Sequence, residues 1–278
     1  MQNNNPHIQK VMKNIIFNLY GTLFGKNFFV RINKFLFQLS LRGLGILNYK
    51  SDYLIGEVYW IKKYIKNKEN ALIIDVGANI GDYSSFIFEA NKSSIVYAFE
   101  PHPETYKLLV RKVNNSNFHH FNVAVGKEND VIKFYDYAIK NGSSQHASIY
   151  LDVIKDLHKG DPVEYEVDII KLDDFIETQK IDVIDLLKLD IEGNEFNALL
   201  GIKKHLAKNK IHAIHFEFNE MNIISKSSFK DFWDILINYT FYRILPGGRL
   251  MELKEYNPVL CEIYAFQNII AILKDEFK

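Results

Sequence analysis

Short apolar runs alternate with helical stretches from residue 71 onward. Several of the runs end in a glycine-containing turn or in an acidic residue, and a helical pattern then begins. Buried runs separated by helices are typical of a parallel sheet that is covered on both faces. The pattern therefore predicts a doubly wound α/β domain, with strands at 71–76, 94–99, 120–125, 183–189 and 211–218.

The remaining pattern predicts additions to this sheet. Two strand-like runs, 131–137 and 163–172, flank a polar insert at about 138–162. The pattern of the C-terminal residues predicts a helix at 228–239, a strand at 242–245, a turn at 246–248 and a last apolar run at 263–273. We expect a Rossmann-like sheet of about seven strands, mostly parallel, with an antiparallel C-terminal strand.

The N-terminal segment differs in charge from the rest of the chain. Residues 1–51 hold seven Lys or Arg and no acid, so this segment carries +7 and the remainder carries −7 in a chain of formal net charge +0. We predict a basic helical arm at 1–50 and the sheet domain at 51–278. The arm packs against its own domain or a second subunit, or it lies on an anionic membrane. The stretch 15–25 is too short and too interrupted to span a bilayer, and no signal peptide is expected.

Composition excludes several classes of protein. With 47% hydrophobic and 24% charged residues, the chain is close to an ordinary globular protein and unlike a disordered, collagenous or coiled-coil chain. Its single cysteine, Cys261, cannot form an internal disulfide. This favours a reducing compartment, and we predict a cytoplasmic location.

Four acidic residues close predicted strands. They are Asp75, Glu100, Asp190 and Glu217. Ligands of open parallel sheets bind outside the carboxyl ends of the strands, so these side chains are expected at one rim. Asp75 also opens a turn with glycines four positions apart, which matches neither the G-x-G-x-x-G fingerprint nor a P-loop.

This turn favours an adenosine ligand without phosphates. Asp75 would repel a phosphate, whereas the carboxylate of Glu100 is placed to accept hydrogen bonds from ribose hydroxyls. S-adenosylmethionine has an ammonium and a sulfonium group and fits this pattern. Two alternatives remain at this point, an NAD-dependent oxidoreductase and a non-catalytic module tethered to a membrane.

Four motifs in order resemble the FkbM-type S-adenosylmethionine-dependent methyltransferases. The similarity covers roughly residues 43–273, and the Lys-Leu-Asp-Ile-Glu-Gly-Asn-Glu block is its most specific part. The Gly247-Gly248 turn and the strand 266–272 also resemble that family. The basic arm and the insert depart from it. The motifs are 74–84, 98–101, 187–195 and 215–217.

The resemblance implies a cofactor site for S-adenosylmethionine. Glu100 would hold the ribose, and Val123 and Ala124 would border the adenine. Tyr83 and Ser84, at a helix N-terminus, would contact the cofactor carboxylate. The residues that would line the methionine and ribose part are Asp75, Gly77, Asn79 and Gly81, with Asp190 beside them.

The resemblance also implies O-methylation of a sugar hydroxyl, in surface-polysaccharide or glycoconjugate biosynthesis. A hydroxyl is a poor nucleophile, so a base is expected, and the candidates are Asp190, Glu217 and His215. Spacing does not indicate a metal, and none is assigned. A nucleic-acid substrate is disfavoured, and the expected partner is a sugar or glycan, either free or nucleotide-linked. The predicted substrate-binding residues are Ser143, Ser144, His146, Lys188 and Glu192.

Overall fold

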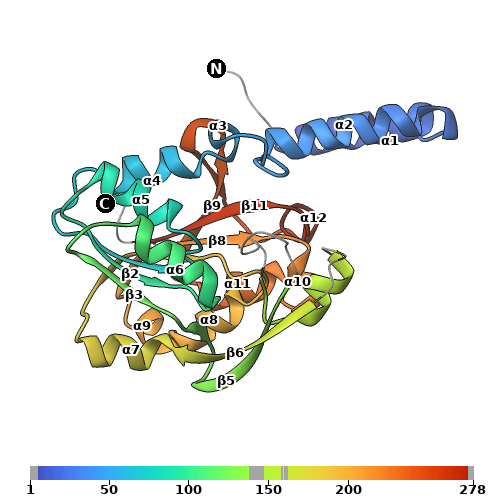
Figure 1. Ribbon diagram of the computed structural model, residues 1–278. Coiled ribbons are helices and arrows are strands. Elements are labelled where there is room, and N and C mark those ends of the chain that lie inside the picture. Colours follow the sequence, from blue (N-terminus) through green and yellow to red (C-terminus); the bar gives the residue numbers. More distant parts are fainter. Residues whose placement is uncertain (1–5, 138–146, 158, 160–161, 275–278) are drawn as a thin grey trace. The chain divides into compact units, whose positions relative to one another are not determined.

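The computed structural model describes residues 6–137, 147–157, 159 and 162–274 (Figure 1). The chain divides into two units, Met1–Leu44 and Gly45–Lys278. The second unit contains an eight-stranded sheet with the order β10-β9-β11-β8-β7-β1-β2-β3 and a smaller sheet with the order β4-β6-β5. This is the predicted α/β class with a mostly parallel sheet and antiparallel C-terminal strands.

The parallel part of the large sheet places the motifs at one rim. Strands β3, β2, β1, β7 and β8 pair in parallel, whereas β11, β9 and β10 pair antiparallel. β10 was not predicted and forms a hairpin with β9 around the 246–248 turn. The strands are β1 Leu72–Val76, β2 Ile95–Phe99, β3 Phe118–Phe121, β7 Ile184–Leu189, β8 Ile211–Phe218, β9 Tyr239–Leu245, β10 Arg249–Leu253 and β11 Gln267–Leu273.

One predicted strand was wrong. The run 120–125 is divided between β3 in the large sheet and β4 (Ala124–Gly126) in the small one. The side-chain amide of Asn122 donates to the carbonyls of Glu100 and Pro101, at 2.8 and 2.9 Å. These bonds tie the chain to the end of β2 where it leaves the sheet, so Val123 and Ala124 come to lie beside Glu100 in the cavity described below.

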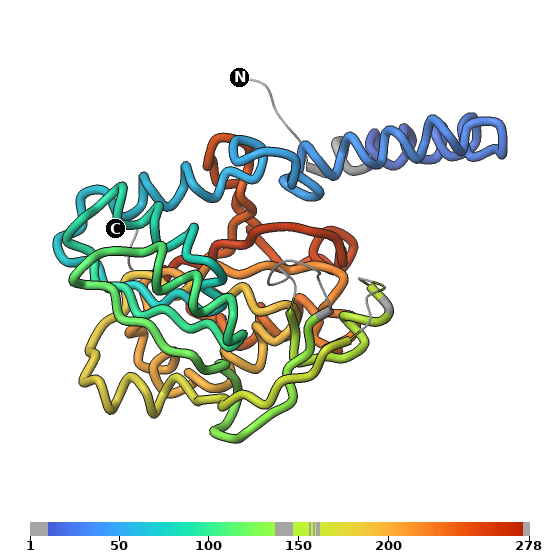
Figure 2. The backbone as a smooth tube through the Cα atoms, in the orientation of Figure 1, coloured from blue at the N-terminus to red at the C-terminus, as the bar shows by residue number. Residues whose placement is uncertain are grey.

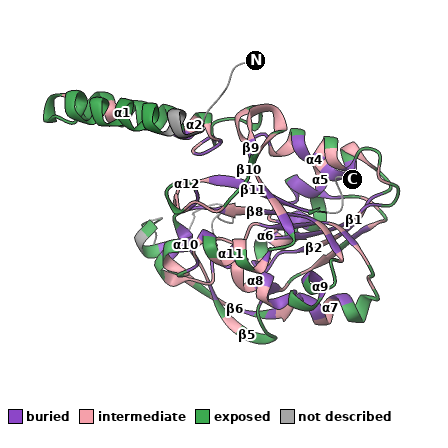
Figure 3. Ribbon diagram, turned by 180° about the vertical axis from the view of Figure 1, so that it is seen from behind, coloured by how far each residue is buried: buried purple, intermediate pink, exposed green. Residues whose placement is uncertain are grey.

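Helices cover both faces of the large sheet (Figure 1). Neighbouring residues on a strand point to opposite faces, so Ile73 packs in one core and Ile74 in the other. Figure 3 shows the strands between them as mostly buried. One core includes α4 Glu57–Ile65, α5 Asp82–Ala90 and α6 Pro103–Lys112; the other includes α7 Leu172–Gln179, α8 Glu195–Gly201, α9 Lys203–Ala207 and α11 Phe229–Ile235.

The small sheet carries the insert. β5 (Asp130–Tyr137) and β6 (Pro162–Lys171) are the two strands predicted to flank the insert, and the structure pairs them antiparallel. Between them, a single π-helical turn is described at Val153–Leu157. The single-turn helices of this unit are α3 Asp52–Ile55, α10 Met221–Ile224 and α12 Pro258–Cys261.

The first unit is a pair of helices, α1 (Pro6–Phe24) and α2 (Val30–Gly43), joined by a 3₁₀ turn at Asn27–Phe29 (Figure 2). The Tyr20 hydroxyl donates to the side-chain oxygen of Asn33 at 2.7 Å. The Asn33 amide in turn donates to the Phe24 carbonyl at 3.0 Å. These bonds hold the two helices together as a hairpin. Among the described helices, none is long and apolar enough to cross a membrane.

Candidate active site

Two turns that follow neighbouring strands pack against each other, backbone to backbone. Gly77 follows β1 and has a φ of +78°, and a Cβ there would lie 1.8 Å from the carbonyl oxygen of Asp190 after β7. The Asp190 amide donates to the Val76 carbonyl at 3.1 Å. A residue with a side chain cannot take this position at such a φ. Glycine at 77 therefore brings Asp190 against the predicted cofactor turn.

A cavity of about 460 Å³ opens at this rim. Asp75, Gly81, Ser84 and His215 are not among its lining residues. Ser143, Ser144 and His146 lie outside the described residues. The structure thus brings together most, but not all, of the predicted site, and the predicted residues that line the cavity are Gly77, Asn79, Tyr83, Glu100, Ala124, Lys188, Asp190, Glu192 and Glu217.

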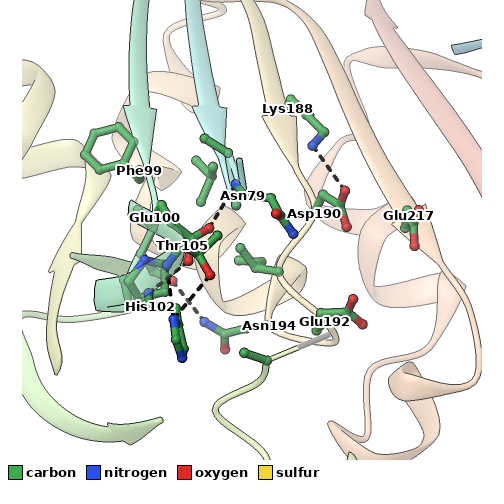
Figure 4. A pocket seen from close by; sticks show the side chains of 18 of the residues that line it. Asn79, Phe99, Glu100, His102, Thr105, Lys188, Asp190, Glu192, Asn194 and Glu217 are labelled. Atoms are coloured by element: carbon green, nitrogen blue, oxygen red, sulfur yellow. Dashed lines mark hydrogen bonds and ion pairs between the residues drawn. The ribbon is translucent and has the colours of Figure 1, made fainter. Parts of the chain in front are cut away.

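Glu100 is held rigidly by the backbone around it (Figure 4). One carboxylate oxygen accepts the Asn79 amide at 2.9 Å, and the other accepts the His102 amide at 2.8 Å. Burial raises the pKa of Glu100 to about 7, although these two hydrogen bonds oppose the shift. Each oxygen keeps a lone pair for a further donor. The carboxylate is therefore preorganised to accept hydroxyl groups, beside the apolar side chains of Phe99, Val123 and Ala124.

A buried charge network lies behind the predicted cofactor turn. Asp75 is fully buried, and the Ser84 hydroxyl donates to its Oδ2 at 2.7 Å. Its Oδ1 has no hydrogen-bond partner and lies 3.7 Å from Lys188 Nζ, which donates to Asp190 at 3.1 Å. Ser84 therefore supports Asp75 rather than facing the cavity.

His215 belongs to the same buried layer. Its Nε2 lies 3.0 Å from the side-chain oxygen of Asn268, so this nitrogen donates and the other, Nδ1, accepts the Tyr83 hydroxyl at 3.2 Å. Burial and the nearby Lys188 lower the pKa of His215 to about 4. The imidazole is neutral near pH 7, has both nitrogens engaged and does not line the cavity.

Asp190 and Glu217 differ in their surroundings. Asp190 is bonded to Lys188. Glu217 accepts a hydrogen bond from the side-chain amide of Asn219 at 3.1 Å. Burial raises the pKa of Glu217 well above its ordinary value, and the negative charges of Asp190, Glu192 and other carboxylates add to the shift. A carboxylate with a raised pKa is a stronger proton acceptor.

The turn after β7 is organised by Glu195. Its carboxylate accepts the backbone amides of Ile191 and Gly193 at 2.9 and 3.2 Å. Glu192, whose φ is +54°, lines the cavity instead of capping the helix. Glu192, predicted to bind the substrate, thus lies at the cavity.

Sequence reasoning missed several polar residues of the cavity, among them Glu57 and Asn194. Glu57 begins α4 after Gly56, and burial raises its pKa to about 7. Its Oε1 lies 3.7 Å from His215 Nδ1. Asn194 donates to the Val125 carbonyl at 2.9 Å, which ties the β7 turn to the small sheet. Asn194 lies within the 187–195 motif, so the sequence contained a signal for it. The pattern around Glu57 contains no signal that this residue lies at the rim of the sheet.

The described ranges contain no cluster of three or more His, Cys, Asp or Glu side chains arranged to hold a metal ion.

The fold and this rim define the class of protein, a Rossmann-like methyltransferase. The model of the FkbM methyltransferase domain matches residues 75–244, and the chain belongs to that family. The cofactor is S-adenosylmethionine. Because the chain belongs to this family, the alternative that it is an NAD-dependent oxidoreductase is rejected.

The individual proteins that this chain resembles share little sequence identity with it. Methyltransferase 1 of Beauveria bassiana (strain ARSEF 2860) is 27% identical over 147 residues, which is 48% of this chain and 59% of the relative. The chain therefore matches less than two thirds of that protein's length. Among solved structures, the plantazolicin methyltransferase BpumL in complex with SAH is 14% identical, with 96% of this chain and 100% of that chain covered and a TM-score of 0.40. A SAM-dependent O-methyltransferase from Thermotoga maritima is 14% identical, with 78% and 64% covered and a TM-score of 0.39.

Proposed function

We propose that this methyltransferase transfers the methyl group to a sugar hydroxyl, as an O-methyltransferase of surface-polysaccharide or glycoconjugate biosynthesis. One observation carries the proposal. Glu100 and Glu217 lie at opposite sides of a single cavity, with Asp190 between them (Figure 4). One carboxylate is thus available for the cofactor ribose and another for an acceptor hydroxyl.

The residues present fit S-adenosylmethionine. Glu100 would hold the ribose, Phe99, Val123 and Ala124 would border the adenine, and the turn after β1 would approach the methionine part. The acidic side chains that line the cavity favour the positive charges of this cofactor. When bound, the cofactor supplies an electrophilic methyl group on a sulfonium.

Glu217 is the proposed general base. Its carboxylate would accept the hydroxyl proton as the acceptor oxygen forms its bond to the methyl carbon. The carbon–sulfur bond breaks, and its electron pair stays on sulfur. Asp190 is less suited to this role because Lys188 already holds its carboxylate. His215 is also less suited, because burial keeps its pKa near 4 and both of its nitrogens are bonded.

The charge of the cavity favours an acceptor without phosphate groups. Within the described part of the chain, Lys188 is the sole Lys or Arg among the lining residues. A nucleotide-linked sugar would bring its phosphates against several carboxylates. The acidic lining residues are Glu57, Asp82, Glu100, Asp190, Glu192, Glu217 and Glu220.

We therefore expect neutral glycan fragments to be methylated at least tenfold faster, in kcat/KM, than nucleotide-linked forms of the same sugars. The test uses S-adenosylmethionine with a labelled methyl group, followed by mass spectrometry and NMR of the product. A methoxy signal on a sugar carbon supports the proposal. A labelled N-methyl or C-methyl group would contradict O-methylation, and a preference for the nucleotide-linked forms would contradict the argument from charge.

Glu100→Ala is expected to weaken S-adenosylmethionine binding by about 1.5 to 3 kcal/mol, because two hydroxyl donors lose a charged acceptor. Isothermal titration calorimetry measures this change. Glu104→Ala, an exposed acid on α6 paired with Lys107, is a matched control that should leave the affinity unchanged. Unchanged affinity in a folded Glu100→Ala protein would remove Glu100 from the ribose site.

Cofactor affinity is also expected to fall as the pH decreases through about 7. The pKa of Glu100 is raised to about 7, so this group takes up its proton in that range and becomes a weaker acceptor. The dissociation constant, measured by calorimetry between pH 6 and 8, should rise toward the acid side. An identical pH dependence in Glu100→Ala would assign the effect to another group.

We also propose that the protein is cytoplasmic. Its basic arm would contact a membrane or a second copy of the chain. The single cysteine and the charge of the arm support them.

A further inference from the structure

The helical hairpin α1–α2 exposes an unusual amount of apolar surface. We call this set of side chains the hairpin surface. It includes aromatic and branched residues on both helices and in the turn that joins them, and its members are Val11, Met12, Ile15, Ile16, Phe17, Leu19, Tyr20, Leu23, Phe24, Phe28, Val30, Ile32, Phe35, Leu36, Phe37 and Leu39. A contiguous apolar surface of this kind marks a site of interaction.

The hairpin surface extends around both helices instead of forming one stripe. Ile15 and Phe17 are two positions apart in α1, and each is 60% exposed. Phe35 and Phe37 have the same spacing in α2 and the same exposure. Residues two positions apart on an α-helix point in nearly opposite directions. A single protein face covers one side of a helix, whereas the apolar part of a lipid layer surrounds an inserted hairpin on all sides.

The turn of the hairpin is its most exposed apolar point. Phe28 is 85% exposed. It packs edge-on against Phe29 with ring centroids 5.2 Å apart, and Phe29 packs against Phe24 at 5.0 Å. Three aromatic rings are thus presented together at the tip. Lys26, in the same turn, places a positive charge beside them.

The positive charge of the hairpin favours one of two possible partners of the hairpin surface, a second copy of the chain or an anionic lipid surface. The first acid of the chain is Asp52, so a second hairpin would add six positive charges with no acid to balance them. Anionic lipid headgroups supply the missing negative charge, while the acyl region accepts the apolar side chains. We propose that the α1–α2 hairpin is a membrane anchor that inserts its aromatic tip into an anionic lipid surface. This inference does not depend on the acceptor proposed above.

The test is flotation of the full chain with vesicles of phosphatidylcholine alone or with 30% phosphatidylglycerol. Binding to the anionic vesicles is expected, and it should weaken with added salt. The double variant Phe28→Gln/Phe35→Gln should lower the partition coefficient by about tenfold or more, because two exposed rings no longer enter the lipid. Lys26→Glu/Arg31→Glu/Lys34→Glu should abolish the preference for anionic vesicles.

Matched controls come from the second unit. Val259→Gln/Ile237→Gln removes two apolar side chains that are 81% and 60% exposed, and Lys254→Glu reverses an exposed charge there. Both should leave vesicle binding unchanged. Cofactor affinity and circular dichroism, unchanged in every variant, show that the fold is intact.

A dye at the tip gives an independent readout. The native Cys261 is buried, so Phe28→Cys can be labelled selectively with an environment-sensitive dye, and Val259→Cys serves as its control. A blue shift with anionic vesicles at position 28 alone supports insertion. Absence of vesicle binding by the full chain would overturn the proposal. So would a dimer that dissociates in Phe28→Gln/Phe35→Gln while vesicle binding stays the same, because the surface would then serve a second copy.

Discussion

Glu217→Gln is expected to lower kcat by about 10² to 10⁴ while changing the affinity for S-adenosylmethionine little, because a general base acts in the transition state. The amide keeps the size of the side chain and can still pair with Asn219, but it cannot take a proton. Steady-state kinetics and calorimetry on the same protein separate the two effects.

The pH profile of kcat gives a second measure of the same role. Burial and neighbouring carboxylates raise the pKa of Glu217 well above its ordinary value, so the competent, ionised form increases as the pH rises through that pKa. Rate should therefore rise toward alkaline pH in the native enzyme, and this limb should vanish in Glu217→Gln.

Asp190→Asn is the matched comparison. Asp190 accepts a hydrogen bond from Lys188, and Lys188 also lies near Asp75. Removing the negative charge of Asp190 should therefore change cofactor affinity as well as rate. Near-normal turnover in Glu217→Gln together with a large loss of kcat in Asp190→Asn would move the base to Asp190. Near-normal turnover in both variants would refute the two assignments.

Gly77→Ala is expected to destabilise the fold by about 3 kcal/mol or more and to abolish cofactor binding. The residue has a φ of +78°, and the added Cβ would lie 1.8 Å from the carbonyl oxygen of Asp190. A left-handed conformation and a clash with backbone each cost about 1 to 3 kcal/mol, and here they add. Urea denaturation measures the free energy of unfolding.

Gly21→Ala is the control for this substitution. No heavy atom lies within 4 Å of a Cβ at that helical position, so alanine should be neutral or stabilising. A Gly77→Ala protein with native stability and cofactor affinity would mean that the two turns can separate at little cost, and it would contradict the packing described here.

Local pattern and motif order were sufficient for the class of fold and for placing the turn after β1 at the cavity. Strand β2 was predicted to within one residue of its observed bounds, because its run IVYAF contains no charged position that would interrupt the pattern. The 120–125 run was misjudged because apolar residues lie on both sides of Asn122, where the chain changes sheets. That break depends on the contact of Asn122 with the end of β2, which no local pattern contains.

The sequence by itself determined that four strand-end carboxylates would meet at one rim, since parallel strands present their carboxyl ends to the same edge of a sheet. Only the tertiary structure decided how those carboxylates differ. Asp75 is buried against Ser84, Asp190 is bonded to Lys188, and Glu217 faces the cavity among other acids. The ionisation of a carboxyl group depends on its burial and on charges brought close by folding, often from distant parts of the chain, as Glu57 is brought to His215.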